Sequence, residues 1–341
     1  MTLAISVFLT LNSTATAQNS LRIALLHSGL GREGPGLLLR DIRRAEPDVT
    51  AIITAIASHA PDALMLLDFD YDLNGLALLA FAAQLAEAGH PMPYHIAPQP
   101  NSGVATGLDL DGDGRSGTAD DAQGWAAFAG SGGMALLSRW PIEHAELRDH
   151  TGFLWRDLPD ARLPTFNATL FPAPEVFDIQ RLASVAAFEV PLLIHDRRLT
   201  IMGYHAGPPA FGGAHQRNRN RNADETRFWR LRLDGMLGPP PTAPFVLLAD
   251  ANLDVENGAG IHSEIAALLT HPSMQDPHPT GAHPARGVTS DTTGYWPEGP
   301  GALRVDYVLP SAELRVLDAG LYWPHPQAKH SLVWVDIAWP P

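Results

Sequence analysis

The sequence predicts a layered α/β fold, of the α+β kind, in which strands are covered by helices. Early in the chain, apolar runs at 21–27 and 63–69 indicate buried strands, and periodic apolar segments at 49–56 and 76–89 indicate helices. The 30 glycines and 30 prolines are typical of a protein with many short strands and long loops. Because 341 residues show no linker and no repeat, we expect one domain over 19–341.

The composition argues against some classes of function. The formal net charge of −14 and the pI of about 5.4 disfavour a broad basic surface that wraps nucleic acid. An acidic chain suits the collection of divalent cations, and a small phosphate-bearing substrate or a nuclease with one local basic strip stays open. The sequence has no cysteine, so disulfides are impossible and stability must come from the core and bound ions.

Residues 1–18 are expected to be a signal peptide. An apolar segment from Leu3 to Leu11 is followed by the small residues Ala15-Thr16-Ala17 before Gln18, as at a cleavage site. The apolar run is too short to span a membrane. The usual positive residues are missing, which leaves open a misplaced start codon or another kind of segment. We expect a periplasmic or secreted protein.

The rest of the chain continues with apolar runs that end at breakers or at polar side chains. In chain order, we expect strands at 132–142, 185–193 and 198–205, a helix that begins at Asp224, a strand that starts at Phe245, a helix at 261–270, and strands at 301–311 and 330–339.

An aspartate and an asparagine end the strand that starts at Phe245. Because side chains alternate along a strand, Asp250 and Asn252 are expected to leave on the same face. A carboxylate and an amide side by side can position a water or a phosphate oxygen. The alternative is a strand followed by an ordinary Asx turn.

A second candidate pair lies in the last two strands. Asp306 has apolar neighbours and needs a partner, because an unpaired buried carboxylate is costly. His330, at the start of the last strand, is a suitable partner. Such a pair makes the imidazole a better base, or stabilises it as a cation beside a phosphate.

The segment DLDGDGRSGTAD, residues 109–120, has the spacing of a twelve-residue calcium loop. Asp109, Asp111 and Asp113 occupy positions 1, 3 and 5, Gly114 occupies position 6, and Asp120 occupies position 12. We expect a structural calcium ion here, although the usual last ligand is Glu. The alternative is an acidic surface loop.

Three arginines, Arg217, Arg219 and Arg221, form a basic cluster in this acidic chain. They are candidates for binding substrate phosphate. Equally, they fit a solvated loop that balances nearby carboxylates.

Six motifs, in this order, resemble the endonuclease/exonuclease/phosphatase family. They are GMALLSRWPI, FLWRDLPDARLP, the histidine that ends a strand at 205, LLADAN, LRVDYVLPS and HSLVWVDI. Each is weakly specific alone, but together they are specific. The resemblance extends from about residue 21 to residue 338 and is closest to a secreted bacterial branch with a DLDGDG insert. It implies a four-layer sandwich of two packed mixed β-sheets flanked by helices.

The resemblance also implies roles for individual residues. Asp250 would activate the attacking water, and Asn252 would hold a phosphate oxygen. His205 would be a second phosphate-binding imidazole, and His330 would contact the phosphate, oriented by Asp306. A divalent cation would neutralise the phosphoryl oxygens and the leaving oxygen.

Three positions depart from the family pattern, and all belong to the metal pocket. His27 stands where Asn is usual, and Asp68 where Glu is usual as the main metal ligand. Ala328-Lys329-His330 replaces Ser-Asp-His. A histidine nitrogen favours Mn²⁺ or Zn²⁺ over Mg²⁺. Lys329 should weaken cation binding, unless it replaces the cation's charge or points to solvent.

The function implied is a secreted, metal-dependent phosphoesterase, whether phosphodiesterase, nuclease or phosphatase. Its cofactors would be Mg²⁺, Mn²⁺ or Zn²⁺ at the active site and Ca²⁺ in the 109–120 loop. The alternative is a catalytically silent relative that binds phosphate-bearing ligands or a protein partner. Fold analogy leaves the substrate open among nucleic acids, sphingomyelin, inositol phosphates and simple phosphomonoesters.

Overall fold

Two mixed β-sheets form the centre of the protein in the computed structural model, which describes residues 20–339. The expected signal peptide, residues 1–18, lies outside the described residues. The first sheet has six strands in the order β16-β17-β1-β2-β4-β3. They are β16 (Val316–Tyr322), β17 (Leu332–Ala338), β1 (Ser20–Leu30), β2 (Ala63–Phe69), β4 (Gly133–Ser138) and β3 (Tyr94–Ile96).

The second sheet has five strands in the order β15-β10-β9-β8-β5. They are β15 (Asp306–Pro310), β10 (Phe245–Asp250), β9 (Arg197–His205), β8 (Ala187–Ile194) and β5 (Arg148–Asp149). Each sheet contains one parallel pair, β1 with β2 and β9 with β10, among antiparallel neighbours. The strands expected at 185–193 and 198–205 are confirmed as β8 and β9, which pair as an antiparallel hairpin.

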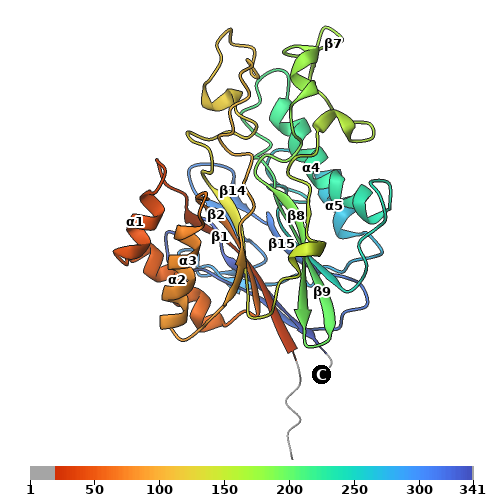
Figure 1. Cartoon of the computed structure of the whole chain (residues 1–341). Coiled ribbons are helices and arrows are strands. Elements are labelled where there is room, and N and C mark those ends of the chain that lie inside the picture. The colour runs from red at the N-terminus through yellow and green to blue at the C-terminus, as the bar shows by residue number, and fades with distance from the viewer. Residues whose placement is uncertain (1–19, 340–341) are drawn as a thin grey trace, which may run out of the picture.

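Helices cover the outer face of each sheet, so the fold has the four layers that the resemblance implies (Figure 1). The first sheet carries α1 (Leu37–Arg43), α2 (Pro47–His59) and α3 (Leu76–Glu87), and the second carries α4 (Arg217–Leu233) and α5 (His262–Leu269). Among the described residues, no helix is both long and apolar enough to cross a membrane.

The alternation of side chains along each strand builds three apolar layers. On β1, Ile23 and Leu25 face the second sheet, whereas Ala24 and Leu26 face the helices of the first. Burying each large aliphatic side chain contributes about 1.5–3 kcal/mol, so both faces of the sheets stabilise the fold.

Short two-stranded ribbons and 3-10 helices lie outside the two large sheets. The ribbons are β6 (Thr165–Phe166) with β7 (Thr169–Leu170), β11 (Gly281–Ala282) with β12 (Thr289–Ser290), and β13 (Gly294–Trp296) with β14 (Gly301–Leu303). The 3-10 helices are η1 (Ala119–Asp121), η2 (His144–Glu146), η3 (Trp155–Asp157) and η4 (Pro174–Asp178).

Three expected elements were wrong in their extent. The strand expected over 132–142 is the shorter β4, which ends at Ser138, where the hydroxyl accepts the N–H of Trp140. The helix expected to begin at Asp224 begins at Arg217, because Arg221 and Asn222 in its polar first turns donate to carbonyls of neighbouring loops. The strand expected over 301–311 is two strands: β14 pairs with β13, and β15 pairs with β10. Asp306 is consequently the first residue of β15, and His330 precedes β17.

Candidate functional site

The candidate site lies where strand ends of the two sheets meet. In the second sheet, Asp250 at the end of β10 is paired in register with His205 of β9 on one side and with Asp306 of β15 on the other. The first sheet supplies His27 from β1 and, just before β17, His330. The contact between sheets therefore brings together residues that are far apart in sequence.

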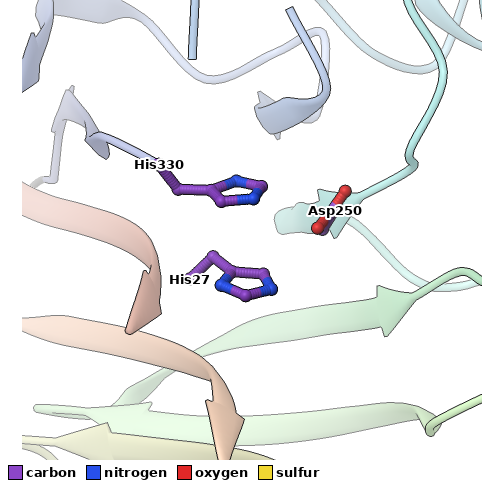
Figure 2. A group of neighbouring side chains, drawn as sticks. All are labelled: His27, Asp250 and His330. Carbon is purple, nitrogen blue, oxygen red and sulfur yellow. The ribbon is translucent and has the colours of Figure 1, made fainter. Parts of the chain in front are cut away.

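His27, Asp250 and His330 form the centre of this group. One ligand atom of each lies within 4.8 Å of the others, and Figure 2 shows the two imidazoles beside the carboxylate. The rings of His27 and His330 stack, with centroids 4.0 Å apart and planes at 9°. The ring of His205 meets His27 edge-on at 5.3 Å. Three imidazoles thus surround one carboxylate.

The expected pair of Asp306 and His330 is formed. Nδ1 of His330 lies 2.8 Å from Oδ2 of the carboxylate, so Nε2 is left to face other groups. The hydroxyl of Thr293 accepts the N–H of Asp306 at 2.9 Å. Burial raises the pKa of Asp306 to about 7 and lowers the pKa of His330. Oδ1 of Asp306 has no hydrogen-bond partner within residues 20–339.

Asp250 is buried and carries a strongly perturbed carboxyl group. Burial, and next the charge of Asp306, raise its pKa to about 7. Its Oδ2 lies 3.5 Å from Nε2 of His205. Burial, and next the neighbours His27 and His330, lower the pKa of His205 well below the ordinary value. Nδ1 of His205 lacks a hydrogen-bond partner in the described part of the chain.

Asn252 lies beside Asp250 through a turn rather than through strand alternation. β10 ends at Asp250, and Asn252 has the left-handed φ of 49°. Its backbone N–H donates to Oδ1 of Asp250 at 2.9 Å, which is the Asx turn that the sequence offered as the alternative. Its side-chain amide donates to the carbonyl of Ala206 at 2.8 Å. The turn fixes the carboxylate of Asp250.

Asp68 lies beside the three-residue group rather than within it. It has a left-handed φ of 51° at a register shift between β1 and β2. Its carboxylate is closely packed: a Cβ on Gly31 would lie 2.4 Å from Oδ1, and one on Gly132 would lie 2.9 Å away. Asp70 holds both of these loops, because it accepts the N–H groups of Arg32 and Gly132.

Lys329 is exposed, whereas the neighbouring His330 is buried. Its backbone carbonyl accepts the N–H of Tyr295 at 2.8 Å. This placement agrees with the alternative that the ammonium points to solvent. Its charge still contributes, after burial, to the lowered pKa of His330.

The acidic loop brings three of its four candidate calcium ligands together. One oxygen each of Asp109, Asp111 and Asp113 lie within 4.8 Å of one another. Asp109 also accepts the N–H groups of Gly112 and Gly114, which curls the loop. Asp120 lies apart from this group and lines the cavity described below.

The three arginines have different surroundings. The guanidinium of Arg221 is buried and donates to the carbonyls of Gln123, Arg181, Leu182 and Ala183, which is a structural arrangement. Arg219 donates to Gln216 at the surface. Arg217 lines the cavity next to His205, where it makes long contacts of 3.3 and 3.4 Å to the carbonyl of Asp120.

Sequence reasoning missed the residues that hold the site residues in place. Thr293 supports Asp306, and Asp70 supports the glycine loops around Asp68. The motif FLWRDLPDARLP is hydrogen-bonded to α4, because Nε1 of Trp155 and the backbone N–H of Arg162 both donate to Asp224. The only sequence signal that could have indicated these supporting residues is a polar side chain close to the end of a strand.

Comparisons with known proteins agree on the fold. A crystal structure of an endonuclease/exonuclease/phosphatase from Beutenbergia cavernae DSM 12333 superposes with a TM-score of 0.57 at 15% identity, covering 94% of this chain and 71% of that one. A family protein from Leptotrichia buccalis C-1013-b gives 0.51 at 12% identity, covering 94% and 100%. Sphingomyelinase C from Streptomyces griseocarneus gives 0.51 at 17% identity, covering 93% and 99%.

Sequence comparisons give two results. No curated protein sequence matches the chain. The model of the Endonuclease/Exonuclease/phosphatase family matches residues 27–335, from His27 to the last strand, and so includes the whole candidate site. The chain therefore belongs to the endonuclease/exonuclease/phosphatase family.

Proposed function

We propose that the protein is an exported, metal-dependent phosphoesterase whose site is the group around Asp250. One observation carries the proposal: His27 and His330 from the first sheet converge on Asp250 from the second, within 4.8 Å. Membership in a family of phosphoester hydrolases gives the reaction class. Buried titratable groups that converge in this way cost stability, and such groups are typical of catalytic sites.

Asp250 is the group that accepts the proton of the attacking water. Burial and the nearby Asp306 raise its pKa to about 7, so it is able to take a proton near neutral pH. The N–H of Asn252 holds one carboxylate oxygen at 2.9 Å and keeps the other directed toward His205. A base that is held in one orientation needs little reorganisation in the reaction.

The phosphoryl oxygens are bound by imidazole and amide groups. His330 presents Nε2, because Asp306 occupies Nδ1 at 2.8 Å. His205 presents Nε2, which lies 3.5 Å from Oδ2 of Asp250, and Asn252 retains one amide N–H. Donors that are already oriented stabilise the charge that develops on phosphorus oxygens.

The same group fits a transition metal better than Mg²⁺. His27, His330 and Asp250 offer two nitrogens and one oxygen, a set that suits Zn²⁺ or Mn²⁺, whereas Mg²⁺ prefers oxygen alone. The pairing of His330 with Asp306 is the carboxylate–histidine arrangement that orients metal ligands. When bound, the cation would neutralise charge on the phosphate; Nε2 of His330 would then be its ligand, and His205 and Asn252 would supply the donors to the phosphoryl oxygens.

Hydrolysis of bis(p-nitrophenyl) phosphate tests the proposal. The assay is run separately in Mg²⁺, Mn²⁺, Zn²⁺ and Ca²⁺, with His330→Ala as the control. We expect turnover in Zn²⁺ or Mn²⁺ that falls by at least about a hundredfold in the control. Turnover that the control retains would assign the activity to a contaminant.

A second assay, with p-nitrophenyl phosphate, separates diesterase from monoesterase activity. Absence of turnover with both substrates in every metal would contradict the enzyme and leave the silent, phosphate-binding alternative. Export rests on residues 1–18 alone. N-terminal sequencing of protein recovered from the periplasm is expected to start after residue 17 or 18.

A further inference from the structure

A cavity of about 580 Å³ opens directly beside the candidate site. His205 and Asp68 line it, so it is continuous with the group that surrounds Asp250. Its size falls within the range of small-molecule pockets, roughly 300–1,000 Å³. A phosphate alone would leave most of this space unfilled. The cavity is therefore large enough for the organic part of a phosphoester.

Two aromatic side chains line the cavity and remain open to solvent. Trp125 is 71% exposed and Phe211 is 92% exposed, so neither contributes to the core. Phe211 also has a left-handed φ of 66°, which is unfavourable for a bulky residue. Exposed aromatic residues that gather at one cavity are typical of a surface that stacks on a ligand.

Two residues of the cavity lining also carry buried polar atoms that have no partner. Ser102 is only 3% exposed, and its hydroxyl has no hydrogen-bond partner within residues 20–339. Nε of Arg217 is likewise buried and unpaired in that range, and its terminal nitrogens make only long contacts. Both of these atoms are buried beneath the cavity surface, so the exposed rings of Trp125 and Phe211 are the groups that a ligand in the cavity would contact.

We propose that this cavity binds an aromatic or heteroaromatic ring carried by the phosphoester substrate. The ring stacks on Trp125 and Phe211, the two exposed aromatic side chains that line the cavity. The proposal rests on the proposed function, because it requires the phosphate of the same molecule to lie at His205 and His330. It restricts the substrates to esters of aromatic or base-bearing alcohols.

Binding of two stable phosphonates tests this assignment without turnover. Isothermal titration of the metal-loaded protein compares phenylphosphonate with methylphosphonate, which share the anionic group. We expect phenylphosphonate to bind about tenfold more tightly, as stacking on two aromatic side chains allows. Trp125→Ala and Phe211→Ala should remove this preference and leave the affinity for methylphosphonate unchanged.

Phe166→Ala is the matched control, because Phe166 is an exposed phenylalanine that does not line the cavity. It should retain the preference. Equal affinities of the wild type for both probes would overturn the ring site and leave the phosphoesterase standing. Octylphosphonate bound as tightly as phenylphosphonate would overturn the aromatic assignment in favour of a lipid chain. If neither phosphonate binds, the phosphate site itself fails, and the ring site fails with it.

Discussion

The carboxylate of Asp68 occupies space that is open only because two neighbouring residues, Gly31 and Gly132, have no side chains. A Cβ on Gly31 would lie 2.4 Å from its Oδ1, closer than atoms can approach, and Gly132 lies nearly as close. The atom in conflict is the free end of a side chain, so the backbone can stay in place while the carboxylate moves. The two glycines therefore determine where Asp68 points.

We predict that Gly31→Ala lowers activity more than stability. The added methyl group displaces the carboxylate of Asp68, and misplacing a site group by about 1 Å can cost roughly a hundredfold in rate. The assay is kcat/KM for bis(p-nitrophenyl) phosphate, with the melting temperature measured in parallel. Gly34→Ala is the control, because its Cβ would meet only Leu37 at an ordinary 3.6 Å. Equal kcat/KM for the two variants would contradict this role.

For single residues, the sequence predicted which side chains share the candidate site, but not their relative geometry. His205, Asp250, Asp306 and His330 were expected in one site from motif order, and they converge. The stacking of His27 on His330 has no local signal, because it depends on how the two sheets approach. Strand alternation likewise fails beyond Asp250, where the backbone of Asn252 turns to a left-handed conformation.

At the level of secondary-structure elements and loops, the acidic loop 109–120 brings carboxylates close enough together to bind one cation. Its three clustered carboxylates, Asp109, Asp111 and Asp113, repel one another unless a positive charge is added. We predict that calcium at about a hundredfold its dissociation constant stabilises the protein by about 2.7 kcal/mol. The melting temperature of the wild type should rise by several degrees, and Asp111→Ala should remove the rise.

A control variant of this loop tests whether calcium is bound by the three clustered aspartates alone or by these three together with Asp120. Asp120→Ala should keep the response to calcium, because Asp120 lies outside the cluster although it occupies position 12. Melting curves are recorded in EDTA and in calcium for all three proteins. Identical calcium responses of the wild type and Asp111→Ala would show that this loop does not bind the ion that stabilises the fold.

Helix α4 carries a buried carboxyl group that the mechanism does not use. Glu225 accepts the N–H groups of Ser184 and Gly207, and burial raises its pKa from 4.5 to about 7. Because the folded pKa is the higher one, the stabilising contribution is complete below pH 4.5 and is lost as pH rises through 7.

We predict that Glu225→Gln reduces this pH dependence. Between pH 4.5 and pH 8 the wild type should lose about 3 kcal/mol of unfolding free energy that the variant does not lose. Urea denaturation at both pH values measures the difference, with the surface variant Glu298→Gln as control. If the wild type and Glu225→Gln change in parallel, Glu225 does not titrate in this window.

The start of α4 shows why some elements escape sequence prediction. Residues 217–222 alternate arginine and asparagine and have no apolar period, so the helix was expected to begin only at Asp224. The helix forms because Arg221 and Asn222 bond to carbonyls of neighbouring loops. Such bonds join distant segments, and no local pattern reveals them.

In the whole molecule, the site depends on the packing of one sheet against the other. His27 comes from the first sheet and Asp250 from the second, so the spacing between sheets determines their distance. Gly203 of β9 marks a point of close approach. A Cβ there would lie 2.6 Å from the methyl carbon of Met65 on β2. The sequence predicted two packed sheets by resemblance, whereas this local fit is visible only in the structure.

We predict that Gly203→Ala and Met65→Ala are strongly coupled. Alone, the first overpacks the interface at about 1–3 kcal/mol and the second leaves a cavity at about 2–5 kcal/mol. In the double variant the new methyl group occupies part of that cavity, so the combined cost should fall short of the sum by about 1 kcal/mol or more. Urea denaturation of the four proteins gives the coupling.

Leu64→Ala is the control, because Leu64 is equally buried but faces the helices, and its cost should add to that of Gly203→Ala. Simple additivity of Gly203→Ala with Met65→Ala would show that the sheets adjust their spacing freely, and the geometry of the site would then not depend on this contact.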